Sequence, residues 1–123
     1  MAQQPWKESG LNMVSNSFTY RLSNTADADI DEIIDYIALV LKNPIAAKSL
    51  YDQLIKIIQH LCEMPRIGHI VDNEFDRRDD VRWLPIDNYI LYYVIDDEEK
   101  IINVLRIVSA RRDQHMILSS IIK

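Results

Sequence analysis

Residues Val81–Asp113 read VRWLPIDNYILYYVIDDEEKIINVLRIVSARRD, and this stretch decides the fold. Two of its segments, Tyr89–Ile95 and Ile101–Val108, are rich in the branched and aromatic residues that favour β-strands. The acidic run Asp96–Glu99 lies between them and is typical of a short polar hairpin loop. The sequence therefore predicts two long antiparallel strands joined by a tight turn.

A shorter run, Arg82–Leu84, precedes this hairpin and predicts another strand. Pro85 follows it, and because proline has no N–H to donate to a neighbouring strand, we expect Pro85 at a strand end or a sheet edge. The last strand is followed by two adjacent basic residues, Arg111 and Arg112. We therefore expect three antiparallel strands that end in an arginine pair.

The segments before this stretch predict a strand and two helices. Phe18–Ser23 alternates as a short strand does. Asn24 or Thr25 is expected to cap the first helix. The break at Asn43 and Pro44 separates it from a second helix, which ends before Pro65. The apolar residues of each helix recur at helical spacing, and in the first helix they are Ile30, Ile33, Ile34, Ile37 and Leu41.

This order of elements, β-α-α-β-β-β, predicts an α+β fold. Two amphipathic helices with so short a connection form a hairpin, and the hairpin is expected to cover one face of a small, mostly antiparallel sheet. Residues 1–17 are polar and show no periodicity, so they are expected to be a loose N-terminal extension or tag. The domain itself is assigned to residues 18–123.

Composition limits the possible functions. A chain of 123 residues with 48% hydrophobic residues suits one domain with one core. It has neither an apolar run of about 20 residues for a membrane span nor a signal-type apolar block, so a cytoplasmic protein without membrane contact is expected. Gly10 and Gly68 are the only glycines, too few for a phosphate-binding loop, and no cofactor is expected. Cys62 cannot form an internal disulfide, and it lies with His60 and His69 in a set too small for a metal site.

Charge is unevenly distributed along the chain. The net charge of −5 argues against a surface that follows nucleic acid throughout. Residues 101–123, in contrast, carry Arg106, Arg111, Arg112 and Lys123 against a single acidic residue, Asp113. This local positive region is either a solvated strand end or a binding site, and the arginine pair is the better functional candidate.

Several segments in this order resemble the RelE/ParE superfamily of toxins from type II toxin–antitoxin modules. They are the first strand, IDYIALVLKNPIAAKSLYDQL (residues 34–54), MPRIG (residues 64–68) and the stretch 81–113, and the resemblance covers residues 18 to about 118. It implies a growth-inhibiting toxin that is neutralised by a cognate antitoxin encoded beside it. It also implies that DNA is contacted only through the toxin–antitoxin complex.

Two mechanisms divide the superfamily. RelE-like members cleave mRNA on the ribosome with basic residues and a C-terminal tyrosine, whereas ParE-like members poison DNA gyrase without nuclease chemistry. Here the two RelE-like basic positions match Tyr89 and Asp80, and the tyrosine position matches Ile117. Cleavage needs a base, an acid and charge stabilisation, which the remaining residues supply poorly. The resemblance therefore favours a ParE-like binding protein rather than an enzyme, with gyrase as its target.

The candidate site residues follow from this interpretation. The residues expected to bind the target are Arg82, Arg106, Arg111 and Arg112. The strand 89–95 is apolar on both faces, so unless the C-terminal segment covers the second face, the antitoxin is expected to cover it with a helix or an added strand. The residues assigned to that contact are Tyr89, Leu91 and Tyr93. The alternatives are a ribosome-dependent mRNA endoribonuclease and a decayed toxin that binds only its antitoxin. The residues available to the nuclease are Arg82, Arg111, Arg112 and His115.

Overall fold

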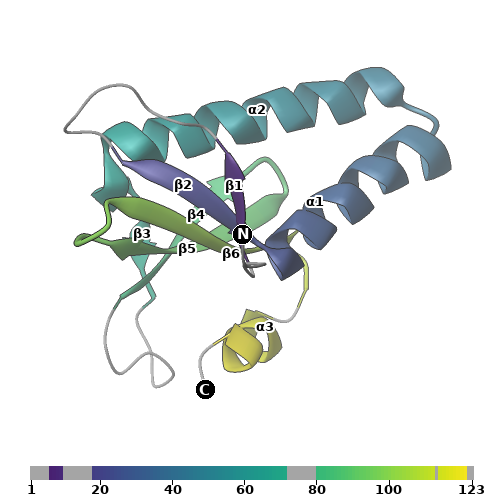
Figure 1. Ribbon diagram of the computed structural model, residues 1–123. Helices are drawn as coiled ribbons and strands as arrows, with labels where there is room; N and C mark the ends of the chain where they lie inside the picture. Colours follow the sequence, from purple (N-terminus) through teal and green to yellow (C-terminus); the bar gives the residue numbers. More distant parts are fainter. Residues whose placement is uncertain (1–5, 10–17, 72–79, 113, 122–123) are drawn as a thin grey trace.

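The computed structural model describes residues 6–9, 18–71, 80–112 and 114–121 (Figure 1). The strands are β1 (Trp6–Ser9), β2 (Thr19–Ser23), β3 (His69–Ile70), β4 (Val81–Ile86), β5 (Tyr89–Asp96) and β6 (Ile101–Ser109). The helices are α1 (Asn24–Asp35), a π-helix (Tyr36–Val40), α2 (Pro44–Glu63), a 3-10 turn (Pro65–Ile67) and α3 (Gln114–Ile121).

The strands form one sheet in the order β1-β2-β6-β5-β4-β3. Only β2 and β6 pair in parallel, and every other neighbouring pair is antiparallel. Figure 1 shows α1 and α2 as a hairpin on one side of the sheet and α3 on the other. The predicted α+β fold is confirmed, and its β-α-α-β-β-β order is extended by β1, β3 and α3. Within the described ranges, no helix has the length and apolar character needed to cross a membrane.

The N-terminal residues differ from the expected loose extension. Residues Trp6–Ser9 pair antiparallel with β2, from Trp6 opposite Ser23 to Ser9 opposite Tyr20. The prediction of a loose segment is therefore wrong for these four residues. Backbone groups alone can pair with a free sheet edge, so this strand needs no apolar alternation that the sequence would reveal. Residues 1–5 and 10–17 of the expected extension lie outside the described part of the chain.

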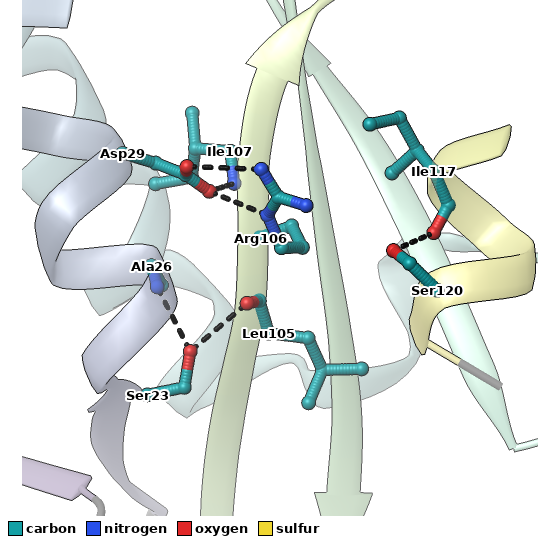
Figure 2. Close-up of polar contacts among 8 residues, drawn as sticks. All are labelled: Ser23, Ala26, Asp29, Leu105, Arg106, Ile107, Ile117 and Ser120. Carbon is teal, nitrogen blue, oxygen red and sulfur yellow. Dashed lines mark hydrogen bonds and ion pairs between the residues drawn. The ribbon is translucent and has the colours of Figure 1, made fainter. Parts of the chain in front are cut away.

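The first helix begins without a loop after β2. Its cap is Ser23, the last residue of the strand, rather than Asn24 or Thr25. The Ser23 hydroxyl accepts a hydrogen bond from the Ala26 N–H at 2.9 Å and donates one to the Leu105 carbonyl, also at 2.9 Å (Figure 2). One side chain thus caps α1 and holds its start against β6.

The second helix begins as the sequence predicts. The Asn43 side chain accepts a hydrogen bond from the Ala46 N–H at 3.1 Å, and Pro44 occupies the first turn. Pro85 lies inside β4 and pairs with Ile90, so of the two predicted places, a strand end or a sheet edge, the first is wrong. The described residues of β3 pair with Arg82 and Trp83 only, so β4 has an open edge at Pro85. An open edge requires no N–H from the proline.

The sheet has an apolar core on each face. On the face under the helical hairpin, Leu54 and Ile58 of α2 belong to the same cluster as Leu91 and Tyr93 of β5. Side chains alternate along β5, so its other apolar set points to the opposite face. There α3 adds a residue to a second cluster, formed by Val71, Val81, Tyr92, Val108 and Ile117. The C-terminal segment therefore covers part of the face that the sequence left open.

Candidate functional site

The arginine pair lies in the turn that follows β6. The Arg111 N–H donates to the Ser109 hydroxyl at 3.2 Å, and the Arg112 N–H donates to the Ser109 carbonyl at 3.1 Å. Both residues are exposed. Among the residues that the structure describes, neither guanidinium has a hydrogen-bond or ion-pair partner. The backbone of this turn is thus fixed, and two exposed cationic side chains extend from it.

A groove of about 570 Å³ opens beside these arginines. Its lining comes from α1 with the start of the π-helix, from β5 and from the end of β6 with the following turn, and includes Glu32, Tyr36, Tyr89, Ser109, Arg111 and Arg112. Burial raises the pKa of Tyr89, and the neighbouring Tyr36 and Asp87 raise it further. The Tyr89 hydroxyl therefore stays protonated at neutral pH and can donate a hydrogen bond. The structure brings Arg111, Arg112 and Tyr89 together at one site.

Arg106, in contrast, forms a buried ion pair with α1. Its Nε and Nη2 donate to the two carboxylate oxygens of Asp29 at 2.8 and 3.1 Å (Figure 2). The same carboxylate accepts a hydrogen bond from the Ile107 N–H at 3.0 Å. Val104 is the last residue of β6 that pairs with β2, so beyond it this edge of β6 is open to Asp29. The hydrogen bond to Asp29 is the main cause that raises the pKa of Arg106. This guanidinium anchors α1 to the sheet and is not free for a target.

Arg82 stabilises the turn after α2. Its Nη1 donates to the Gly68 carbonyl at 2.9 Å and, more weakly, to the Arg66 carbonyl at 3.4 Å. The hydroxyl of Tyr93 holds the same turn, since it accepts the Gly68 N–H at 2.9 Å and donates to the Pro65 carbonyl at 2.6 Å. Arg82 and Tyr93 are partners across β4 and β5, so together they fix the chain between helix and sheet.

Strand register separates Arg82 from the arginine pair. Arg82 lies opposite Tyr93, whereas Ser109, two residues before Arg111, lies opposite Tyr89. Four residues of strand span roughly 13 Å, and Arg111 lies beyond that point. The four predicted arginines therefore lie in three places. Arg111 and Arg112 line the groove, Arg106 is bound to α1, and Arg82 is bound to the turn after α2. His115 belongs to α3, but its side chain is outside the described part of the structure.

Two of the three residues assigned to the antitoxin are inaccessible. Leu91 and Tyr93 are each 0% exposed, in the core beneath the helical hairpin. Burial also raises the pKa of Tyr93, against smaller opposing effects from the Gly68 hydrogen bond, Arg82 and Arg66. Tyr89 is partly exposed in the groove. Ile117, at the position of the RelE-like tyrosine, packs in the second core with 5% exposure.

The sequence did not indicate the α1 side of the groove. Tyr36 was not assigned a role, although it lines the groove and is 51% exposed. Tyr36 lies to one side of the apolar stripe formed by Ile30, Ile34 and Ile37. Because single apolar residues are common at a surface, this position alone did not identify a contact surface.

Cys62 and the neighbouring histidines give no sign of a metal site. Cys62 is 3% exposed in the helix-side core, and burial, with a smaller effect of Glu63, raises the pKa of its thiol to about 11. No group of three histidine, cysteine or carboxylate residues that could hold a metal occurs in the part of the chain that is described. Cys62 therefore packs as a small apolar residue of the helix-side core.

Comparison with known proteins places this fold in a family. Residues 20–114 match the model of the ParE toxin of the type II toxin–antitoxin system, parDE. No curated protein sequence matches the chain. Among solved structures, the fold is similar to the chromosomal ParDE toxin–antitoxin system from P. aeruginosa, with a TM-score of 0.59 and 22% identity over 77% of this chain and 98% of that chain. It is also similar to the toxin–antitoxin complex RelBE2 from Mycobacterium tuberculosis, with a TM-score of 0.54 and 21% identity over 76% and 98%. The family match spans most of the chain, including the groove and its arginine pair, and the chain therefore belongs to the ParE toxin family of type II toxin–antitoxin systems.

Proposed function

We propose that this protein is the toxin of a type II module in the cytoplasm and inhibits growth by binding a protein target, DNA gyrase. A cognate antitoxin neutralises it, and DNA is contacted only through that complex. Membership of the ParE toxin family supports the module. Both similar structures are of toxin–antitoxin systems, which supports an antitoxin partner for this chain as well.

The dispersal of the basic residues is the observation that carries the choice of a protein target. Phosphodiester cleavage needs a base, an acid and cationic groups around one phosphate. Arg106 is bound to Asp29, and Arg82 is bound to the turn after α2, so of the four predicted arginines only Arg111 and Arg112 line the groove. A pair of free guanidinium groups is well suited to bidentate contacts with carboxylates on a protein surface.

The test replaces both arginines with alanine. The double variant R111A/R112A should lose growth inhibition and retain the unfolding temperature of the wild type, because both side chains are exposed and make no hydrogen bond or ion pair to another described residue. The matched control is K48A/K56A, which removes two exposed cations from α2, away from the groove, and should remain toxic. Induction of the wild type should produce DNA-damage signalling and filamentous growth.

The nuclease and the decayed toxin predict different results. Primer extension on a translated message should show no codon-dependent cuts after induction of the wild type. Cuts in the ribosomal A site that disappear in R111A would favour the endoribonuclease. A wild-type chain that binds the product of the adjacent reading frame but never inhibits growth would be a decayed toxin. Loss of soluble protein in R111A/R112A would assign the arginines to folding.

A further inference from the structure

The turn of the helical hairpin exposes an apolar surface that no mechanism above uses. We call it the hairpin tip, and it consists of five apolar residues, Tyr36, Leu39, Val40, Leu41 and Ile45, and of Lys42 between them. Leu39 is 70% exposed, Val40 63% and Ile45 83%. None of the five residues of the π-helix is buried. Lys42 is the only charged residue between positions 36 and 47, so this surface is apolar with one cation.

The hairpin tip projects from the molecule. Figure 1 shows the turn between α1 and α2 extending past the edge of the sheet, away from β6 and α3. With side chains of this size more than half exposed, the five residues leave roughly 400 Å² of apolar surface in water. A patch of this size is comparable to the largest apolar patch on a typical monomeric protein, and that patch is often functional. The hairpin tip is therefore a candidate interaction surface.

The hairpin tip continues into the groove of the arginine pair. Tyr36 belongs to both, because it lines the groove and also begins the π-helix. In this π-helix the hydrogen bonds run from i to i+5, as in Leu41 N–H to the Tyr36 carbonyl, so Val40 and Leu41 follow Tyr36 by about one turn and lie on its side of the helix. A partner that lies along α1 can thus contact Arg111 and Arg112 at one end and the hairpin tip at the other.

From this continuity we infer that the hairpin tip is the second half of the target-binding surface. The partner is a larger protein with an apolar pocket that receives Leu39 and Val40. Carboxylates on that protein lie at the rim of the pocket, opposite Lys42, and next to the pocket, opposite Arg111 and Arg112. The inference rests on the proposed function, and it adds the place and the chemistry of the contact with the target.

Area, charge and shape favour such a partner over a second copy of this chain. A stable interface buries about 800 Å² per partner, roughly twice what the hairpin tip offers, and two convex tips would bury little of each other. Two copies would also bring together net charges of −5 each. Nucleic acid is disfavoured, because a polyanion requires several cations and the hairpin tip supplies only Lys42.

The test compares two sites on the helical hairpin. The variant L39S/V40S removes apolar side chains from the tip, and its effect on folding should be small because both are mostly exposed. The control M64S changes an apolar side chain that is 52% exposed, just after the far end of α2. Binding to purified DNA gyrase should weaken about tenfold or more in L39S/V40S and stay unchanged in M64S. Growth inhibition by L39S/V40S should decrease together with its gyrase binding, whereas its complex with the antitoxin should form as in the wild type.

A second variant tests the charge complementarity. K42E reverses the only charge of the hairpin tip and should also weaken gyrase binding, whereas K56E on α2 should not. Wild-type gyrase binding and growth inhibition in L39S/V40S would overturn the inference while leaving the proposed function intact. If L39S/V40S lost only antitoxin binding, the hairpin tip would bind the antitoxin and the inference would be overturned. If L39S/V40S converted a wild-type dimer into a monomer, the tip would bind a second copy of the chain, which would also overturn the inference.

Failure of the proposed function gives a different pattern. A wild-type chain that neither inhibits growth nor binds gyrase would contradict both proposals. A wild-type chain that inhibits growth without binding gyrase would contradict only the identity of the target. Growth inhibition then decides the role of the hairpin tip. Loss of growth inhibition in L39S/V40S but not in M64S supports the inference, and retention of growth inhibition in both variants overturns the inference.

Discussion

Asp29 is the side chain that fastens the first helix to the sheet. Replacing it with alanine leaves the largely buried Arg106 without its counter-ion and the Ile107 N–H without its acceptor. Loss of one partner of such a pair typically costs about 3–5 kcal/mol, so D29A should lower the free energy of unfolding by about that amount in urea titrations. The exposed pair Lys48–Asp52 provides the comparison, and D52A should cost less than about 0.5 kcal/mol. Equal losses in the two variants would contradict the anchoring role of Asp29.

Cys62 should make stability depend on pH in the alkaline range. Burial raises the pKa of its thiol from 9.0 to about 11. The folded protein therefore retains a proton that the unfolded chain releases above pH 9, so the stabilisation is complete below pH 9 and is lost between pH 9 and 11. The decrease in the free energy of unfolding over this range should be smaller in C62A than in the wild type. The tyrosines with raised pKa, Tyr89, Tyr92 and Tyr93, are common to both proteins and cancel in the comparison.

The reactivity of the same thiol provides an independent check. At pH 8 a pKa of about 11 leaves roughly a hundredfold less thiolate than the usual 9.0 does. A disulfide reagent should therefore modify native Cys62 at least that much more slowly than the urea-unfolded chain. Equal rates would show that the helix-side core opens readily around Cys62.

At the scale of elements, the junction between β2 and α1 depends on Ser23. S23A removes the hydrogen bond that caps α1 and the one to the Leu105 carbonyl, so it should destabilise the protein by about 1–2 kcal/mol. Asn24, the cap expected from sequence, is exposed and belongs to the helix, so N24A should cost only a few tenths of a kcal/mol. Thermal unfolding of the two variants checks the assignment. A larger destabilisation by N24A than by S23A would instead assign the cap to Asn24, as the sequence suggested.

The elements that the sequence predicted are those with a periodic apolar pattern. The strands β5 and β6 and both helices of the hairpin carry such a pattern, because each buries one face or both. The strand β1 was not predicted, since it joins the sheet through backbone pairing that leaves no pattern. The sequence left open whether Pro85 ends β4 or lies at a sheet edge, because it could not show that β3 is too short to reach Pro85. Local sequence thus predicted the elements, but not the edge pairings between distant segments.

At the scale of the whole molecule, the site was only partly predictable. The arginine pair was proposed as a site because charge density is visible in the sequence, and both residues are exposed. The engagement of Arg106 with Asp29, 77 positions away in sequence, depends on where β2 leaves the sheet. The burial of Leu91 and Tyr93 depends on which face of β5 receives the hairpin. Strand register and helix placement decide these features, and neither can be read from one residue.

The helical hairpin and α3, which pack on opposite faces of the sheet, should differ in their contribution to stability. The hairpin packs Ile58, which is fully buried, into the larger core, so I58A should lower the global free energy of unfolding by about 2–5 kcal/mol. On the other face α3 has eight residues, and Ile117 is its only described residue in the buried set of the second core. So short a helix is not stable in water by itself. Its attachment depends most on Ile117, with smaller contributions from the partly buried Leu118 and Ile121.

I117A should therefore release α3 while leaving most of the global stability intact. Amide hydrogen exchange should become fast in residues 114–121 of I117A, and protection in β5 and β6 should change little, because the helix-side core is untouched. I58A should instead reduce protection throughout the sheet. If I117A lowered the global free energy of unfolding as much as I58A while exchange in α3 stayed slow, the two faces would unfold as one cooperative unit. In that case α3 would be an integral layer of the fold rather than a separately attached cover.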